Sequence, residues 1–370
     1  MRHGSRVQLC GISVGTEFVS DAWSSFQIPI SDFIATVYIA KEQHCDMTVK
    51  RTLAKMLGFQ VISLANGNIG FVSSSRNSPT SVIATPDYKQ ITICSLESEE
   101  TADLIRLPLE CRFCYEGIVS LHAACVEGDG YAVCFTGDSG VGKSTRAQAW
   151  IEGLGARFIS GDRPAIRLET DGCTVCGVPW DGKEQIFRNV ERPLTAIFEV
   201  RRAPFTRLRR LSGDQAYGVL MRQSFIPMWD TDTAALAMAN VRRLSRIVPV
   251  YRLFCGPSAE DAREVYEILM NHPEQIREEK DDMKIRSGFV LRNVVDEYMV
   301  MPTGENIEKY DGAVVMNAVS AFVFQQLENG ISRDDLLTAI VNEFDVDEAT
   351  AAADLDELLA QFGKMGLLED

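Results

Sequence analysis

The clearest chemical motif in the chain is a glycine-rich segment that ends in a lysine and a serine. Residues 137–144 read Gly-Asp-Ser-Gly-Val-Gly-Lys-Ser, which satisfies the spacing G-x-x-x-x-G-K-[ST] of a phosphate-binding loop. In such loops, glycines let backbone N–H groups point at phosphate, the lysine reaches the β- and γ-phosphates, and the serine ligates Mg²⁺. The motif predicts an ATP site that consists of Gly137, Asp138, Ser139, Gly140, Val141, Gly142, Lys143, Ser144 and Thr145.

The segments on both sides of the motif suit a strand and a helix. The apolar run Ala132–Thr136 precedes it, and a helical stretch Ser144–Trp150 follows it. In a strand–loop–helix unit, the positive N-terminal end of the helix favours an anionic ligand. The alternative is a glycine-rich turn with a chance lysine, but the agreement of both flanking elements favours a phosphate loop.

A carboxylate follows the next predicted strand. If Ala156–Ser160 runs parallel beside Ala132–Thr136, its C-terminal end reaches the phosphate edge of the sheet. Asp162 at this end could accept the proton of an attacking hydroxyl or help to hold Mg²⁺. A plain strand-end aspartate that caps Arg163 is the alternative.

A predicted hairpin brings a histidine to the same place. The turn Glu127–Gly130 folds Leu121–Val126 back on Ala132–Thr136, so we expect His122 opposite about Phe135. A histidine there can hydrogen-bond the phosphate or the base carboxylate, and a purely structural histidine is the alternative.

Residues 177–184 form a second turn-rich segment, Gly-Val-Pro-Trp-Asp-Gly-Lys-Glu. Lys183 could contact phosphate, and Glu184 could bind a metal or a peptide, although an ordinary loop fits the pattern equally well. The predicted metal ligands are thus Ser144, Asp162 and Glu184.

Two other patterns suggest chemistry but have simpler explanations. The pairs Cys111/Cys114 and Cys173/Cys176 have 58 residues between them, which is more than zinc ribbons use. Several cysteines lie in apolar runs, which suggests reduced thiols and a reducing, cytoplasmic compartment; they are Cys94, Cys125, Cys134 and Cys255. A group of arginines could clamp phosphate but more often forms a solvated face; it comprises Arg201, Arg202, Arg207, Arg209 and Arg210.

Length, composition and charge limit the classes of protein. With 370 residues and 46% hydrophobic residues, the chain can form two or three domains, and no run of eighteen apolar residues predicts a membrane span. Of the formal charge of −15, residues 281–370 carry −13, from 19 Asp or Glu against 6 Lys or Arg. This acidity disfavours nucleic acid and favours a basic or flexible peptide as partner. The oligomeric state stays open, a homo-oligomer included.

Element patterns predict the domain organisation. Residues 1–112 read as a β-rich domain, 113–273 as an α/β domain around the loop, and 274–283 as a polar linker. Residues 284–370 contain short strands followed by three helical stretches, which suggests a winged-helix α+β module.

The residues around the loop resemble the catalytic domain of the HPr kinase/phosphorylase family over about residues 118–270. The resemblance rests on Leu121–Ala124, the loop and Asp162 within Phe158–Arg163. It implies roles for His122 near the phosphates, Lys143 and Ser144 at ATP·Mg²⁺, and Asp162 as base toward a serine hydroxyl. Gly161 departs from the family, which usually has two adjacent aspartates. Residues 179–184 resemble those of HPr-kinase-like proteins from peptide-modification gene clusters.

Residues 284–370 resemble PqqD-like domains, which recognise precursors of ribosomally made, modified peptides. The resemblance rests on Val290–Arg292, Tyr298, Val314–Asn317, Ala321-Phe322 and Gly366–Leu368. It implies that a leader peptide adds as a strand in a groove between Gly312–Asn317 and a helix Val346–Phe362. A winged-helix dimerisation module is the alternative.

Together these patterns predict an ATP-dependent kinase that phosphorylates a Ser or Thr hydroxyl of a precursor peptide held by the C-terminal module. An ATP-gated peptide-binding protein without phosphoryl transfer is an alternative that Gly161 permits. An ATPase that powers a partner enzyme is another.

Overall fold

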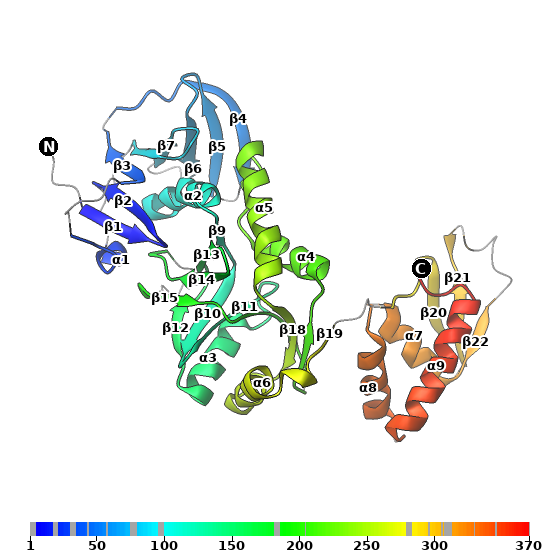
Figure 1. The fold of residues 1–370 in the computed structure, drawn as a ribbon. Coiled ribbons are helices and arrows are strands. Elements are labelled where there is room, and N and C mark those ends of the chain that lie inside the picture. Colours follow the sequence, from blue (N-terminus) through cyan, green and yellow to red (C-terminus); the bar gives the residue numbers. More distant parts are fainter. Residues whose placement is uncertain are drawn as a thin grey trace. The chain divides into compact units, whose positions relative to one another are not determined.

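The computed structural model of the protein describes residues 5–17, 21–29, 35–42, 44–56, 58–74, 80–94, 100–180, 186–203, 205–278, 283–294, 297–304, 306, 313–328, 330–344 and 346–369. Contacts divide the chain into two compact units, Met1–Glu278 and Glu279–Asp370, which Figure 1 shows as ribbons.

The first unit begins with a β-sheet that packs on a long helix, α2 (Glu100–Tyr115). In the described residues this sheet has eight strands in the order β1-β2-β3-β8-β7-β6-β5-β4. The strands are β1 (Ser5–Leu9), β2 (Ile12–Thr16), β3 (Val37–Lys41), β4 (Val49–Met56), β5 (Phe59–Leu64), β6 (Ile69–Ser73), β7 (Ser81–Ala84) and β8 (Gln90–Ile93). A short helix, α1 (Asp21–Ser24), follows β2. The β-rich character of this region agrees with the sequence, and the predicted boundary at residue 112 falls within α2.

A second sheet carries the glycine-rich loop. Its described strands follow the order β12-β10-β11-β16-β18-β17-β19, in which β11, β16 and β18 are parallel neighbours. They span β10 (Ala123–Gly128), β11 (Tyr131–Thr136), β12 (Arg157–Ser160), β16 (Ala196–Arg202), β17 (Arg207–Arg210), β18 (Val250–Cys255) and β19 (Arg277–Glu278). Parallel strands that are covered on both faces read as continuous apolar runs, which explains the sequence of β11.

Helices and a third sheet cover the two faces of the second sheet. On one face, α3 (Lys143–Leu154) and α6 (Ala259–Asn271) pack through Trp150, whose ring lies 5.5 Å from that of Phe135. On the other face lie α4 (Gly213–Gln223), α5 (Thr231–Ile247) and a sheet with the described order β15-β14-β13-β9. Its strands are β9 (Ile118–Ser120), β13 (Ala165–Glu169), β14 (Gly172–Cys176) and β15 (Glu191–Pro193).

Two predictions of strand pairing were wrong in detail. β12 was expected to lie beside β11, but it pairs antiparallel with β10. Because β10 is also antiparallel to β11, β12 still runs in the same direction as β11. The hairpin pairs Phe135 with Ala124, not with His122. Its turn contains only the two residues between Gly128 and Tyr131, instead of four, and the shorter turn shifts the register by two residues.

The end of the first unit and the disulfide also differ from expectation. The segment expected as a linker from residue 274 begins with a 3₁₀ turn (Pro273–Gln275) and the strand β19, which pairs with β17.

Cys94, expected as a reduced thiol, forms a disulfide with Cys45. The partners precede β4 and follow β8, so only the folding of the first sheet brings them together.

The second unit is a three-stranded sheet followed by three helices, counted over the described residues. The sheet has the order β20-β21-β22, and its elements are β20 (Phe289–Val294), β21 (Glu297–Pro302), β22 (Val314–Met316), α7 (Ala318–Glu328), α8 (Arg333–Glu343) and α9 (Glu348–Lys364). Phe324, Leu336 and Leu355 lie in a core of its own. The predicted succession of strands and helices is confirmed. None of the helices in the described part of the chain has the length and hydrophobicity needed to cross a membrane.

Candidate active site

The glycine-rich loop joins β11 to α3, as its spacing predicts. Gly137 and Gly142 have φ values of 134° and 101°, a conformation that favours glycine. Gly142 is the N-cap residue of α3, and no side chain accepts a hydrogen bond from the first backbone N–H groups of the helix. Asp138, Ser139, Gly140, Ser144 and Thr145 are exposed, and Val141 is half-buried. The loop can therefore present backbone donors to an anion at a helix N-terminus.

Lys143 lies folded back along the loop. Its Nζ atom donates to the carbonyl oxygens of Gly137 at 3.0 Å and of Asp138 at 3.2 Å, and the residue is only 9% exposed. Burial lowers the pKa of the Lys143 ammonium, and the carboxylates of Asp162 and Asp138 oppose this shift. A buried ammonium held by two carbonyls is suited to exchange them for phosphate oxygens.

His122 and Asp162 form a pair next to this loop. His122 lies just before β10, where its N–H donates to the carbonyl of Gln223 and its own carbonyl accepts from Thr136 Oγ1 at 2.8 Å. Its Nε2 atom is 3.2 Å from Asp162 Oδ1, and Arg163 Nε is 3.4 Å from Asp162 Oδ2. The structure thus brings His122 and Asp162 together, as the resemblance implied, although His122 lies one residue beyond the last hairpin pair, Ala123–Thr136.

The electrostatic surroundings keep the Asp162 carboxylate ionised. The hydrogen bond from His122 holds the pKa of Asp162 below its ordinary value, and the charges of Arg163, His122 and Lys143 act in the same direction against burial. The Asp162 side chain is 29% exposed, so a ligand can reach it. The alternative of a strand-end aspartate that caps Arg163 accounts for the contact between Asp162 and Arg163. It does not account for the contact between Asp162 and His122.

The segment that contains Lys183 and Glu184 lies outside the described residues. The chain resumes beside the site, where Gly161 N donates to Ile186 O and Arg188 N donates to Ile159 O, both near 2.9 Å.

Glu199 is a buried acid at the loop that the sequence reasoning missed. It pairs in register with Thr136, the last residue of β11, and its side chain is 5% exposed. The guanidinium groups of Arg201 and Arg252 lie 2.9 Å from its carboxylate, and that of Arg222 lies 3.7 Å away. The available signal was a lone acid within the apolar run of β16. Three arginines thus surround one buried carboxylate and compensate its charge.

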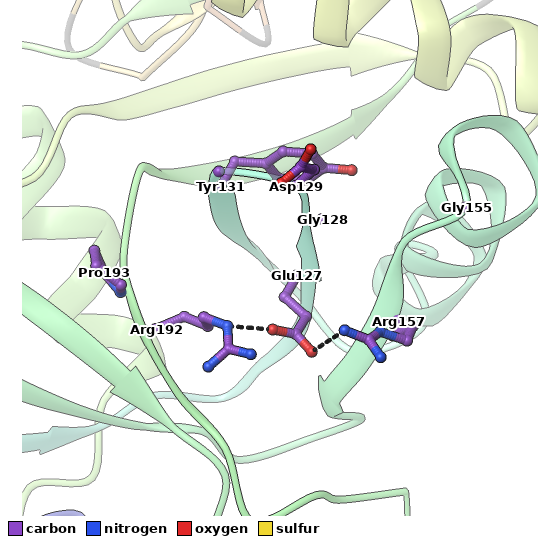
Figure 2. A pocket seen from close by; sticks show the side chains of 9 residues that line it. Glu127, Gly128, Asp129, Tyr131, Gly155, Arg157, Arg192 and Pro193 are labelled. Atoms are coloured by element: carbon purple, nitrogen blue, oxygen red, sulfur yellow. Dashed lines mark ion pairs between the residues drawn. The ribbon is translucent and has the colours of Figure 1, made fainter.

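A cavity of about 500 Å³ lies at the opposite end of the β10–β11 hairpin (Figure 2). Glu127, 2% exposed, extends into it between Arg192 at 2.5 Å and Arg157 at 3.3 Å. Arg188 adds a third contact at 2.8 Å. These arginines compensate a buried carboxylate, as folding requires, and the cavity contains none of the predicted site residues.

The two Cys-x-x-Cys pairs lie on separate elements of the first unit. Cys111 and Cys114 belong to α2, whereas Cys173 and Cys176 belong to β14. Cys176 Sγ is 2.6 Å from the sulfur of Cys10. Among the described residues, no group of three or more His, Cys, Asp or Glu side chains is arranged to hold a metal ion.

In the second unit, the predicted groove residues lie at a sheet edge and on a helix. β22 pairs with β21 on one side, and Val315 on it is 59% exposed. Gly312, expected in the same wall, lies outside the described residues. The predicted helix Val346–Phe362 is α9, which begins at Glu348 because Asp347 caps it. A cavity of about 120 Å³ is lined by apolar residues of α8 and α9, among them Ile340 and Leu358.

Comparisons with known proteins identify part of the chain. Residues 297–368 match the family model described as Coenzyme PQQ synthesis protein D (PqqD), so the predicted PqqD-like domain is confirmed there. TbiB1 in complex with the TbiA(beta) leader peptide is 26% identical, with a TM-score of 0.21, over 23% of this chain and 94% of that chain. The Hpr(Ser) kinase/phosphatase from Coxiella burnetii is 12% identical, with a TM-score of 0.24, over 42% of this chain and 90% of that chain. No curated protein matches the sequence.

Proposed function

We propose that this protein is an ATP-dependent kinase that phosphorylates a serine or threonine hydroxyl of a ribosomally made precursor peptide. The observation that carries the proposal is the His122–Asp162 pair, 3.2 Å apart, at the sheet edge that also holds Lys143 and the glycine-rich loop. A carboxylate base, a buried ammonium and a helix N-terminus are the groups that phosphoryl transfer needs.

The loop supplies the phosphate half of the reaction. Its backbone N–H groups and Lys143 would hold the β- and γ-phosphates of ATP and neutralise the charge that develops during transfer. The fit rests on the uncapped N-terminus of α3 and on the carbonyl contacts that Lys143 can exchange. Ser144 and Asp162, both accessible, would hold Mg²⁺, which would supply positive charge against the phosphates. Glu184, outside the described residues, is the third proposed ligand.

Asp162 would accept the proton of the attacking hydroxyl. Its carboxylate is ionised at neutral pH, and the contacts of His122 and Arg163 lower its pKa further. A weak base suffices, since phosphoryl transfer passes through a loose transition state in which positioning matters more than proton abstraction. His122 would fix the carboxylate orientation through its ring nitrogen.

The PqqD domain would capture the precursor peptide. Among the described strands, β22 is an edge that could take an added strand, and its exposed Val315 offers apolar surface. Tethering the leader there would give the acceptor segment an effective concentration of about 1 mM at the first unit when the linker is short. The acidity of residues 281–370, with 19 acids against 6 bases, suits a basic leader.

The decisive experiment incubates the protein with ATP, Mg²⁺ and the short peptide encoded beside its gene, followed by mass spectrometry. A phosphorylated Ser or Thr that disappears with Lys143→Ala supports the kinase. ATP-dependent peptide binding without phosphopeptide would instead support the gated binding protein, which Gly161 permits. Release of ADP without phosphopeptide would support the ATPase.

A further inference from the structure

Two partly exposed arginines lie beside the buried acid Glu199 at the loop edge of the second sheet. Arg201 follows Glu199 by two residues on β16, so both side chains point to the same face of the sheet. Arg222 reaches the same acid from the last turn of α4. Arg201 Nη2 lies 2.9 Å and Arg222 Nη2 lies 3.7 Å from one oxygen of Glu199, Oε1, whereas Arg252 Nε lies 2.9 Å from the other oxygen, Oε2.

The contacts with Glu199 leave room for a second carboxylate between these arginines. The side chains of Arg201 and Arg222 are 40% and 60% exposed, and each contacts Glu199 through one nitrogen atom of its guanidinium. The 3.7 Å distance of Arg222 exceeds that of a hydrogen bond, so charge attraction rather than a hydrogen bond holds it there. A guanidinium is a planar fork of N–H donors that suits a carboxylate, and peptides carry carboxylates as Asp and Glu.

Two hydrogen bonds connect the surroundings of these arginines to His122. Glu199 pairs in register with Thr136, whose Oγ1 donates to His122 O at 2.8 Å. Gln223, the residue after Arg222, accepts a hydrogen bond from His122 N at 2.8 Å. The arginines therefore lie at the edge of the sheet where an acceptor hydroxyl would approach the loop.

The spacing of the strands sets the distance along a bound peptide. In the described sheet, β16 is next to β11, which carries the loop, and β10 is the strand beyond it. Neighbouring strands are about 4.8 Å apart, so an acceptor hydroxyl between the loop and Asp162 would lie roughly 5–10 Å from β16. An extended peptide rises about 3.3 Å per residue, so this distance corresponds to about two or three residues.

We infer that Arg201 and Arg222 select an acceptor serine or threonine that has an Asp or Glu about two or three residues away. The inference rests on the proposed function, since it takes the protein as a peptide kinase, and it names the substrate class of that kinase. The carboxylate of the peptide would bind between the two guanidinium groups and fix the position of the acceptor hydroxyl. Arg201, which the sequence placed in a group of arginines without a role, thus becomes a specificity residue.

The test combines substitutions in the protein with substitutions in the peptide. The substrate is the precursor peptide encoded beside the gene, and mass spectrometry first locates its phosphorylated residue. Each Asp or Glu within about three residues of that position is then changed to Asn or Gln, which keeps the shape of the side chain and removes its charge. The protein variants are Arg201→Gln and Arg222→Gln, and steady-state kinetics gives KM and kcat for each combination.

Arg210→Gln is the matched control. Arg210 is an exposed arginine at the end of β17. It pairs in register with Tyr251, which belongs to the core on the face of the sheet opposite to Glu199. The control thus removes one exposed arginine from the same sheet without touching the Glu199 cluster.

We expect each of Arg201→Gln and Arg222→Gln to raise KM for the precursor roughly tenfold, because each removes a charge-assisted contact. The kcat and the KM for ATP should stay unchanged, and Arg210→Gln should behave like the wild type. The amide peptide should raise KM of the wild type by roughly tenfold or more. Against that peptide the two arginine variants should cause no further loss, since the contact is already broken.

A phosphorylated residue without a nearby Asp or Glu would overturn the inference, as would effects of protein and peptide that multiply independently. A raised KM for ATP alone would place the arginines at the nucleotide and overturn it as well. A melting curve detects a variant that does not fold, and the amide peptide still tests the inference with the wild type. Equal turnover of both peptides refutes the inference alone, whereas a wild type that forms no phosphopeptide refutes the proposed function with it.

Discussion

His122 Nε2 lies 3.2 Å from Asp162 Oδ1, although His122 precedes β10 and Asp162 follows β12. β10 and β12 pair antiparallel, and the Ala123 N–H donates to Asp162 O at 2.8 Å, so the backbone itself sets this distance. The backbone pairing therefore places both residues at the loop edge of the sheet. The chemistry of the pair can be changed one side chain at a time without removing the backbone contact.

Asp162→Asn should remove turnover, while the loop and Lys143 still bind the phosphates of ATP. The amide keeps the shape of the carboxylate but cannot accept the hydroxyl proton, so we expect kcat to fall roughly 10²-fold or more. Single-turnover phosphorylation together with an ATP titration measures both effects. If the variant transfers phosphate at a rate near that of the wild type, Asp162 is not the base.

His122→Ala should move the acid limb of the kcat/KM profile to higher pH. The hydrogen bond from His122 is the largest contribution that lowers the pKa of Asp162, so its loss raises that pKa and the base becomes protonated at higher pH. Arg163→Gln should shift the limb in the same direction by less, because its contribution is smaller. An acid limb that stays in place in both variants would show that Asp162 does not govern it.

Truncation after Glu278 should cost affinity for the precursor rather than chemistry. The first unit has cores of its own, whereas the PqqD domain lies in the second unit. Loss of tethering should raise KM for the full precursor by roughly 10²-fold or more, with the rate at saturation retained.

The control for this truncation is a short peptide without its leader, whose KM should hardly change. A proline in the docking segment of the leader should imitate the truncation, since it removes a donor from the added strand. An unchanged KM for the full precursor would instead favour the winged-helix dimerisation module.

Cys45→Ser should lower the free energy of unfolding by roughly 2–4 kcal/mol, because the disulfide joins residues 49 apart in the sequence. Urea unfolding of the variant should match that of the wild type in a reducing agent. Thiol titration of the denatured, unreduced protein should find the eight free cysteines of the structure. Ten reactive thiols would restore the prediction of a fully reduced protein.

Local sequence sufficed for elements that depend on neighbouring residues. Glycines at 137 and 142, an apolar run before them and a helical stretch after them determine the β11–loop–α3 unit, because its turn geometry and hydrogen bonds are local. The same holds for the strands and helices of the second unit. The approach of His122 to Asp162 was predictable as well, since both flank short strands around the loop.

Tertiary structure decided what depends on pairing between distant segments. A two-residue turn, rather than four, set the register of β10 on β11, and the insertion of β10 separated β12 from β11. The arginines around Glu199 come from β16, α4 and β18, and the Cys45–Cys94 bridge joins the segment before β4 to the segment after β8. The periodicity of a strand shows which of its faces is buried. Which strands become its neighbours depends on how all strands of the sheet bury their apolar faces at the same time.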